Sequence, residues 1–68
     1  MKNKLKERIK ELRIDKGVPQ KEVAKFLGVV ESCYANYEQG RSEPNLDMLI
    51  KLAKYFGVRT DYLLGLED

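Results

Sequence analysis

The stretch QKEVAKFLGVVESCYANYEQGR, residues 20–41, contains two short segments whose apolar residues recur at helical spacing. Leu27 lies on the apolar side of the first segment, and Tyr34 and Tyr37 lie on that of the second. Gly28 stands between the segments and can take the left-handed backbone conformation that ends a helix. We therefore expect two helices that fold back sharply on each other and leave a polar face of the second helix exposed.

The same spacing continues through the rest of the chain, and no stretch alternates between apolar and polar residues as a strand would. Glycines or prolines separate the apolar runs, and Thr60 is expected to cap the last helix. The sequence predicts an all-α fold, a compact bundle of five helices that contains a helix-turn-helix. The expected helices span residues 3–16, 20–28, 31–38, 46–56 and 60–65.

The size and composition of the chain restrict its class. Its 68 residues are enough for one small domain, with one cysteine and no histidine. A single cysteine excludes an internal disulfide, and one cysteine without any histidine offers no zinc ligand set, so we expect no metal and no cofactor. No apolar run is long enough for a membrane span, and the basic start is not followed by a signal-peptide core. A free thiol without disulfides is typical of the reducing cytoplasm.

The charge is unevenly distributed. Residues 1–16 contain seven Lys and Arg against three Asp and Glu, whereas residues 17–68 contain six against eight. The basic first segment can attract phosphate or an acidic membrane surface, or it can be an ordinary solvated helix face. Charge alone leaves these alternatives open.

Three joined stretches carry a family resemblance: LKERIKELRIDKGVPQKEVAKFLGV at 5–29, YEQGRSEPNLDMLIKLAKYFGV at 37–58, and DYLLG at 61–65. In these stretches the chain resembles the phage repressor and Cro, or XRE-type, helix-turn-helix family. The resemblance implies a lambda repressor-like fold, with residues 1–68 forming a single DNA-binding domain. It also implies that residues 31–38 form the helix that enters the major groove of double-stranded DNA.

By position in this family, the residues expected to contact bases are Glu31, Ser32 and Asn36, with Val30 and Ala35 nearby. Asn36 can form two hydrogen bonds with adenine, and Ser32 can donate or accept. Glu31 can only accept, for example from cytosine, and Val30 can touch a thymine methyl group. Without the resemblance, outward polar residues on a short helix are usually only solvated.

The resemblance also suggests contacts with the DNA backbone. Gln20 occupies the position at the start of the second helix that binds a phosphate and braces the recognition helix. Helix starts present free N–H groups and a positive dipole end to anions. The cations Lys21, Arg41 and Lys10 are further phosphate candidates, although exposed lysines can serve solubility alone.

Arg13 and Glu38 have a different expected role. The family places a partly buried ion pair at these positions, which joins the first helix to the end of the third. We therefore expect a structural pair and not a DNA contact.

The chain departs from the family pattern in several places. Val30 and Pro19 replace the Ser, Thr or Asn that usually caps each helix of the motif, and neither side chain can accept a hydrogen bond. Residues 26–50 contain one cation, Arg41, against four acidic residues, which predicts few phosphate contacts. Cys33 is interpreted as a small packing residue, with a redox role as the alternative.

The function expected from these features is sequence-specific DNA binding by a bacterial or phage transcriptional regulator, most simply a repressor. The alternative is a protein-interaction module of the same fold, such as an antitoxin or antirepressor component. No enzyme chemistry is expected, because histidine is absent and no base accompanies the cysteine. The expected partners are an operator and a second copy of the chain, with no membrane and no small-molecule ligand. Candidate residues for the dimer contact are Tyr55, Val58, Tyr62 and Leu66.

Overall fold

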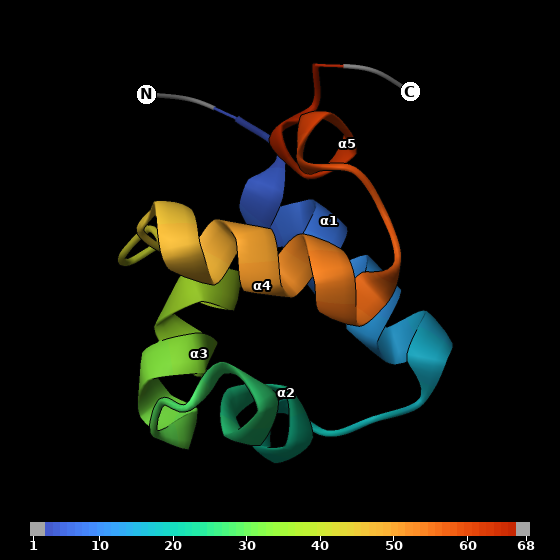
Figure 1. Ribbon diagram of the computed structural model, residues 1–68. Coiled ribbons are helices and arrows are strands. Elements are labelled where there is room, and N and C mark those ends of the chain that lie inside the picture. The colour runs from blue at the N-terminus through green and yellow to red at the C-terminus, as the bar shows by residue number, and fades with distance from the viewer. Residues whose placement is uncertain (1–2, 67–68) are drawn as a thin grey trace.

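The computed structural model describes residues 3–66, so residues 1–2 and 67–68 of the expected domain lie outside the described part. Within it there are helices and no strands, which confirms the all-α expectation (Figure 1). None of these helices is long and apolar enough to cross a membrane. The helices are α1 (Leu5–Lys16), α2 (Gln20–Leu27), α3 (Glu31–Gln39), α4 (Leu46–Phe56) and α5 (Thr60–Leu64).

The first helix begins two residues later than expected, at Leu5 instead of residue 3. The side chain of Asn3 accepts a hydrogen bond from the backbone N–H of Leu5 at 2.9 Å, which keeps Asn3 outside the helix. The other bounds differ from the expected ones by no more than one residue. The expectation that Thr60 caps the last helix was wrong, because Thr60 is the first residue of α5 and Arg59 holds the cap position.

The sharp turn between α2 and α3 is formed by Gly28 and Val29. Gly28 has a φ of 79°, and its N–H donates to the carbonyls of Ala24 and Lys25 at the end of α2. The N–H of Val29 also donates to Ala24, at 3.0 Å, so the chain reverses while the last carbonyls of α2 stay bonded. Val29 packs against the core, as its apolar side chain predicts. The turn therefore fixes the direction in which α3 leaves α2.

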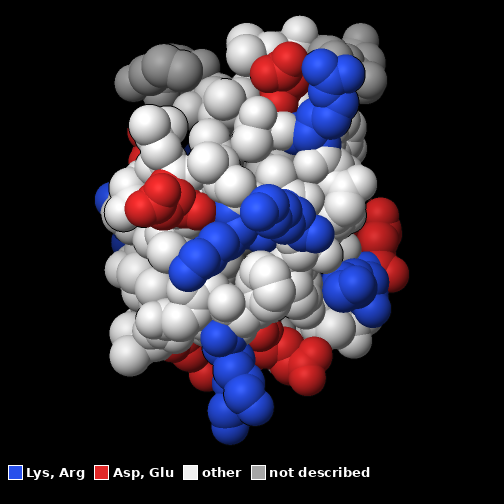
Figure 2. All heavy atoms as spheres, viewed as in Figure 1, with Lys and Arg blue, Asp and Glu red and all other residues white. Residues whose placement is uncertain are grey.

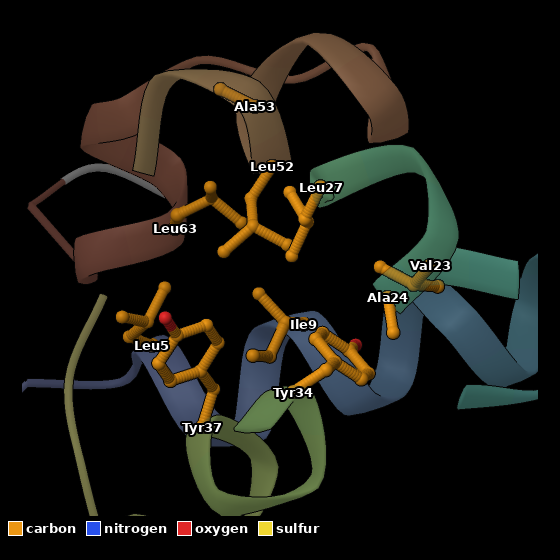
Figure 3. Close-up of a cluster of buried hydrophobic side chains, with 10 residues drawn as sticks. All are labelled: Leu5, Ile9, Val23, Ala24, Leu27, Tyr34, Tyr37, Leu52, Ala53 and Leu63. Carbon is orange, nitrogen blue, oxygen red and sulfur yellow. The ribbon is translucent and has the colours of Figure 1, made fainter. Parts of the chain in front are cut away.

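A single core joins all five helices (Figure 3). In the close-up, Leu52 of α4 lies beside Leu27 and Leu63, while Ile9 of α1 points toward Tyr34 of α3. All five side chains are almost fully buried. Among residues 3–66, α2 and α1 pack most closely on the inner side of α3, and the outer side of α3 faces away from both (Figure 1).

The starts of the helices are capped unequally. Neither Pro19 before α2 nor Val30 before α3 makes a side-chain cap, as the sequence predicts. Before α4, in contrast, the side chain of Asn45 accepts a hydrogen bond from the N–H of Met48 at 2.9 Å. The helix-turn-helix therefore contains two helix starts that a polar capping side chain could stabilise.

Val30→Ser is expected to stabilise the fold by about 1 kcal/mol, because the serine hydroxyl can accept a hydrogen bond from a free N–H of α3. Val30 has extended backbone angles (φ −72°, ψ 155°), as a capping residue requires, and is 70% exposed, so little packing is lost. Thermal unfolding followed by circular dichroism measures the change. Val30→Ala removes the same side chain without providing a cap, and a serine variant that melts no higher than this control would contradict the explanation.

Candidate nucleic-acid interface

The outer face of α3 carries the residues that were expected to contact bases. The helix buries Tyr34, Tyr37 and Glu38 on its inner side. Ser32 is exposed and Asn36 is half-buried one turn further along, so the two side chains share one side of the helix. The remaining candidates adjoin them: Glu31 is exposed at the start of α3, Ala35 is half-buried, and Val30 is exposed in the preceding turn.

This face carries little positive charge. Among residues 26–50 the one cation is Arg41, exposed just after α3, where its N–H donates to the Asn36 carbonyl at 3.0 Å. In the view of Figure 2, Lys and Arg side chains lie over the middle of α4, whereas the lower left of the molecule, where α3 lies, is mostly uncharged. Polar and apolar side chains, and not cations, therefore dominate the outer face of α3.

The two expected phosphate-binding lysines lie on different helices. Lys21 is exposed in the first turn of α2, beside the free N–H groups of that helix start. Lys10 is exposed on α1, and within residues 3–66 no hydrogen bond or ion pair links it to α2 or α3. Lys21 is thus part of the helix-turn-helix, whereas Lys10 belongs to α1.

Gln20, the first residue of α2, turns its side chain toward the inside of the motif. Its amide nitrogen donates to a carboxylate oxygen of Glu38 at 3.0 Å. The amide keeps a second N–H and its carbonyl oxygen for other partners. This link between α2 and α3 was not foreseen in detail, because sequence spacing does not specify the direction of a side chain.

Arg13 and Glu38 meet where α1, α2 and α3 converge. Arg13 Nε donates to one carboxylate oxygen of Glu38 at 2.6 Å, and Nη2 donates to the other at 3.1 Å. The third donor of Arg13, Nη1, reaches the carbonyl of Val18 at 3.0 Å, just before α2. The side chains are 15% and 3% exposed, respectively. A two-point contact of this kind holds three segments in a fixed arrangement.

The buried surroundings change the titration of the groups at this junction. Burial by itself raises the pKa of Glu38, but the hydrogen bonds from Arg13 and Gln20 and the charge of Arg13 outweigh it, so the pKa is lowered. The hydroxyl of Tyr34 is also buried and has no hydrogen-bond partner among the described residues. Burial and the neighbouring Glu38 carboxylate raise the pKa of Tyr34. Glu38 is therefore ionised, and Tyr34 neutral, at neutral pH.

The lowered pKa of Glu38 predicts a loss of stability in acid. The folded state binds the proton of this carboxyl more weakly than the unfolded state, whose pKa is near 4.5. The contribution of Glu38 is therefore complete above that value and is lost as the pH falls through the lower folded pKa. Urea unfolding between about pH 7 and pH 3 measures this, and Glu38→Gln should flatten the curve below about pH 4.5. If the free energy of unfolding fell equally with pH in the natural protein and in Glu38→Gln, the lowered pKa of Glu38 would not explain the loss of stability in acid.

Cys33 and the residues proposed for the dimer contact are largely engaged within the molecule. Cys33 is half-buried and donates to the Tyr37 hydroxyl at 3.5 Å; this contact and burial raise the pKa of Tyr37 to about 12.

Tyr55 packs against Phe26, with ring centroids 4.9 Å apart, and Val58 packs against the core. The candidates differ in exposure, since Leu66 is 71% exposed whereas Tyr55, Val58 and Tyr62 are half-buried.

The structure holds no arrangement suited to metal chemistry in its described part. Within residues 3–66 no group of three or more His, Cys, Asp or Glu side chains is placed to hold a metal ion.

Comparisons with known proteins place this geometry in a family. The helix-turn-helix family model HTH_3 matches residues 9–63. The SPbeta prophage-derived HTH-type transcriptional regulator YonR of Bacillus subtilis is 47% identical over 58 residues, which are 85% of this chain and 54% of that protein. The cryptic phage CTXphi transcriptional repressor RstR of Vibrio cholerae is 41% identical over 51 residues, 75% of this chain and 46% of RstR. The chain therefore spans about half the length of these relatives.

Solved structures agree with the sequence comparisons. The P22 c2 repressor, in a crystal structure with a synthetic operator, superposes on this chain with a TM-score of 0.88 at 29% sequence identity. The matched region covers 97% of this chain and 100% of the repressor chain in that structure. A transcriptional regulator from Listeria innocua superposes with a TM-score of 0.91 at 28% identity, covering 100% of this chain and 64% of its own. With the family match over most of its length, the chain belongs to the helix-turn-helix family of transcriptional regulators.

Proposed function

We propose that this protein binds double-stranded DNA at specific sites and acts in the cytoplasm as a transcriptional repressor, with two copies on each operator. The observation that carries the proposal is the superposition, over nearly the whole chain, on the P22 c2 repressor in complex with its synthetic operator. The turn at Gly28 directs α3 outward, and its outer face offers side chains that suit base edges in the major groove.

The chemistry of the proposed base contacts follows from their donors and acceptors. The Asn36 amide can bond both N6 and N7 of adenine, and Ser32 can donate or accept beside it. Glu31 can accept from the amino group of cytosine, while Val30 and Ala35 can contact thymine methyl groups. A half-site with A·T pairs opposite Asn36 and Val30 suits this surface.

The proposed backbone contacts are few. Gln20 and the free N–H groups at the start of α2 can bind a phosphate, with Lys21 beside them and Arg41 beyond α3. Lys10 on α1 contributes longer-range attraction. Because few cations adjoin α3, the logarithm of the affinity should fall only gently with the logarithm of the salt concentration.

Selection from a random oligonucleotide pool tests the proposal. The pool is incubated with the folded protein at low ionic strength, and the retained duplexes are sequenced. The expected outcome is a repeated half-site in two-fold arrangement, with centres about one helical turn apart. Retention of no duplex above background by properly folded protein would overturn the proposal.

Asn36→Ala is expected to cost about 1–3 kcal/mol of binding free energy on the selected duplex and to relax the preference at one base pair. The affinity for the selected duplex and for single-base variants is measured by gel shift. Lys21→Ala is the contrasting control, since losing a phosphate contact should weaken all duplexes equally. An equal loss on every duplex with Asn36→Ala would make Asn36 a backbone contact instead.

A second candidate function is a protein-interaction module such as an antitoxin or antirepressor component. The scarcity of cations in residues 26–50 favours it, because phosphate attraction there is weak. Gel shifts with genomic fragments, set beside a pull-down from lysate, distinguish the two candidates.

A further inference from the structure

The side-chain amide of Gln20 lies between the start of α2 and the buried ion pair. Its nitrogen, Nε2, donates to Oε1 of Glu38 at 3.0 Å, and Gln20 is half-buried. Glu38 reaches this position from the last turn of α3, and its side chain is 3% exposed. The amide therefore connects a buried carboxylate with the start of α2, where backbone N–H groups are free.

The chemistry of the carboxylate fixes which end of the amide faces it. An ionised carboxylate only accepts hydrogen bonds, whereas the Gln20 amide has two N–H groups and one acceptor oxygen. If the amide were turned over, its oxygen would face Oε1 of Glu38, and the two oxygens would repel each other. Gln20 therefore keeps its nitrogen on the side of Glu38, and the second N–H of that nitrogen remains for another acceptor.

Arg13 makes this arrangement compatible with an anion nearby. Its Nε and Nη2 donate to the two oxygens of Glu38 at 2.6 and 3.1 Å, so the pair carries no net charge. An unpaired carboxylate behind Gln20 would repel a phosphate, and the repulsion would be strong where little water is present to screen it. Because Glu38 is paired with Arg13, it can orient the amide without adding a net negative charge.

We propose that Glu38 is a positioning residue for DNA binding, which acts by holding the Gln20 amide as an N–H donor to a backbone phosphate. The inference rests on the proposed function, in which Gln20 contacts a phosphate. It gives the pair of Arg13 and Glu38 a second role beside the structural one expected from the sequence. With side chains 15% and 3% exposed, Arg13 and Glu38 affect the affinity through Gln20 and not by direct contact with DNA.

Side-chain mobility tests the positioning without DNA. The chain has a second glutamine, Gln39, which is exposed at the end of α3 and serves as the matched internal control. NMR relaxation of the two side-chain Nε2 groups should give an order parameter above about 0.6 for Gln20 and below that value for Gln39. The double variant Arg13→Met with Glu38→Leu removes both charges together. In this double variant the order parameter of Gln20 should fall to that of Gln39.

A thermodynamic cycle on the selected duplex tests whether the pair acts through Gln20. In the natural protein, Gln20→Ala should weaken binding about tenfold, because a hydrogen bond to a charged phosphate is lost. In the double variant the amide is no longer held, so Gln20→Ala should weaken binding only about twofold or less. If the pair only supported the fold, Gln20→Ala would weaken both proteins by the same factor.

The salt dependence of binding identifies a contact made by a neutral donor. Gln20 carries no charge and displaces no counterion, so Gln20→Ala should lower the affinity by a similar factor at every salt concentration. Lys21→Ala removes the charge of the next residue, which is exposed, and should reduce the slope of log affinity against log salt by about 1. The loss with Gln20→Ala should also be equal on all duplexes, since a phosphate contact carries no sequence information.

Circular dichroism melts establish that each variant is folded. Glu38→Gln takes the place of the double variant if the latter does not fold; its amide can donate or accept, so Gln20 loses its single orientation there too. The inference is overturned if Gln20 is as mobile as Gln39 in the natural protein, or if Gln20→Ala and the change at the pair act independently on the selected duplex. Either result leaves the selected duplex, and with it the proposed function, intact. Failure to select any duplex overturns both.

Discussion

Arg13→Met is expected to destabilise the fold by about 3–5 kcal/mol. Glu38 is held by two hydrogen bonds from Arg13 at 2.6 and 3.1 Å, and its side chain is only 3% exposed. Methionine fills a similar volume but leaves the carboxylate buried, with the Gln20 amide as its remaining hydrogen-bond donor among residues 3–66. It also removes the bond to the Val18 carbonyl that holds the entry to α2. Urea unfolding at neutral pH measures the difference.

The double variant Arg13→Met with Glu38→Leu should recover most of this loss, because replacing both charges by apolar groups leaves no buried charge. Lys10→Met on the same helix is the matched control, since Lys10 is exposed and should change stability by no more than about 0.5 kcal/mol. A single Arg13 variant as stable as this control would mean that the pair does not support the fold.

Leu52→Ala is expected to destabilise the fold by about 2–5 kcal/mol. Leu52 is fully buried on α4 and lies among side chains from α2 and α5, including Leu27 and Leu63 (Figure 3). Its truncation removes apolar burial and leaves a cavity that neighbouring helices can close only in part. In a domain this small, such a loss is a large part of the total stability.

Leu46→Ala is the matched control for Leu52→Ala. It makes the same chemical change on the same helix, but Leu46 is 76% exposed, so the cost should stay near 0.5 kcal/mol or below. Urea unfolding of both variants provides the comparison. Similar costs at the two positions would contradict the packing of α4 described above.

The helices were predictable because two strong local signals agree. Apolar residues recur at helical spacing, and a glycine with positive φ follows each helix, as Gly28 does after α2. The capping details were harder. Asn45 directly precedes an apolar run, which is a recognised signal for a helix start, and it caps α4 although no capping role was predicted for it. The start at Leu5 depends on one hydrogen bond that the Leu5 N–H donates to the Asn3 side chain, which spacing does not reveal.

The outer face of α3 was also predictable, because two buried tyrosines define the inner side and leave Ser32 and Asn36 opposite. The direction of the Gln20 side chain was not, since it depends on how α1, α2 and α3 converge around Glu38.

The central proposal is that α3 presents Asn36 to an adenine in the major groove. A thermodynamic cycle tests it directly: each adenine of the selected half-site is replaced in turn by 7-deazaadenine, which lacks the N7 acceptor. Binding is then measured for the natural protein and for Asn36→Ala. At one adenine the replacement should weaken the natural protein by about 1 kcal/mol or more and leave Asn36→Ala unaffected. If the two changes add independently at every adenine, Asn36 does not contact that base edge, and the proposed docking of α3 is wrong.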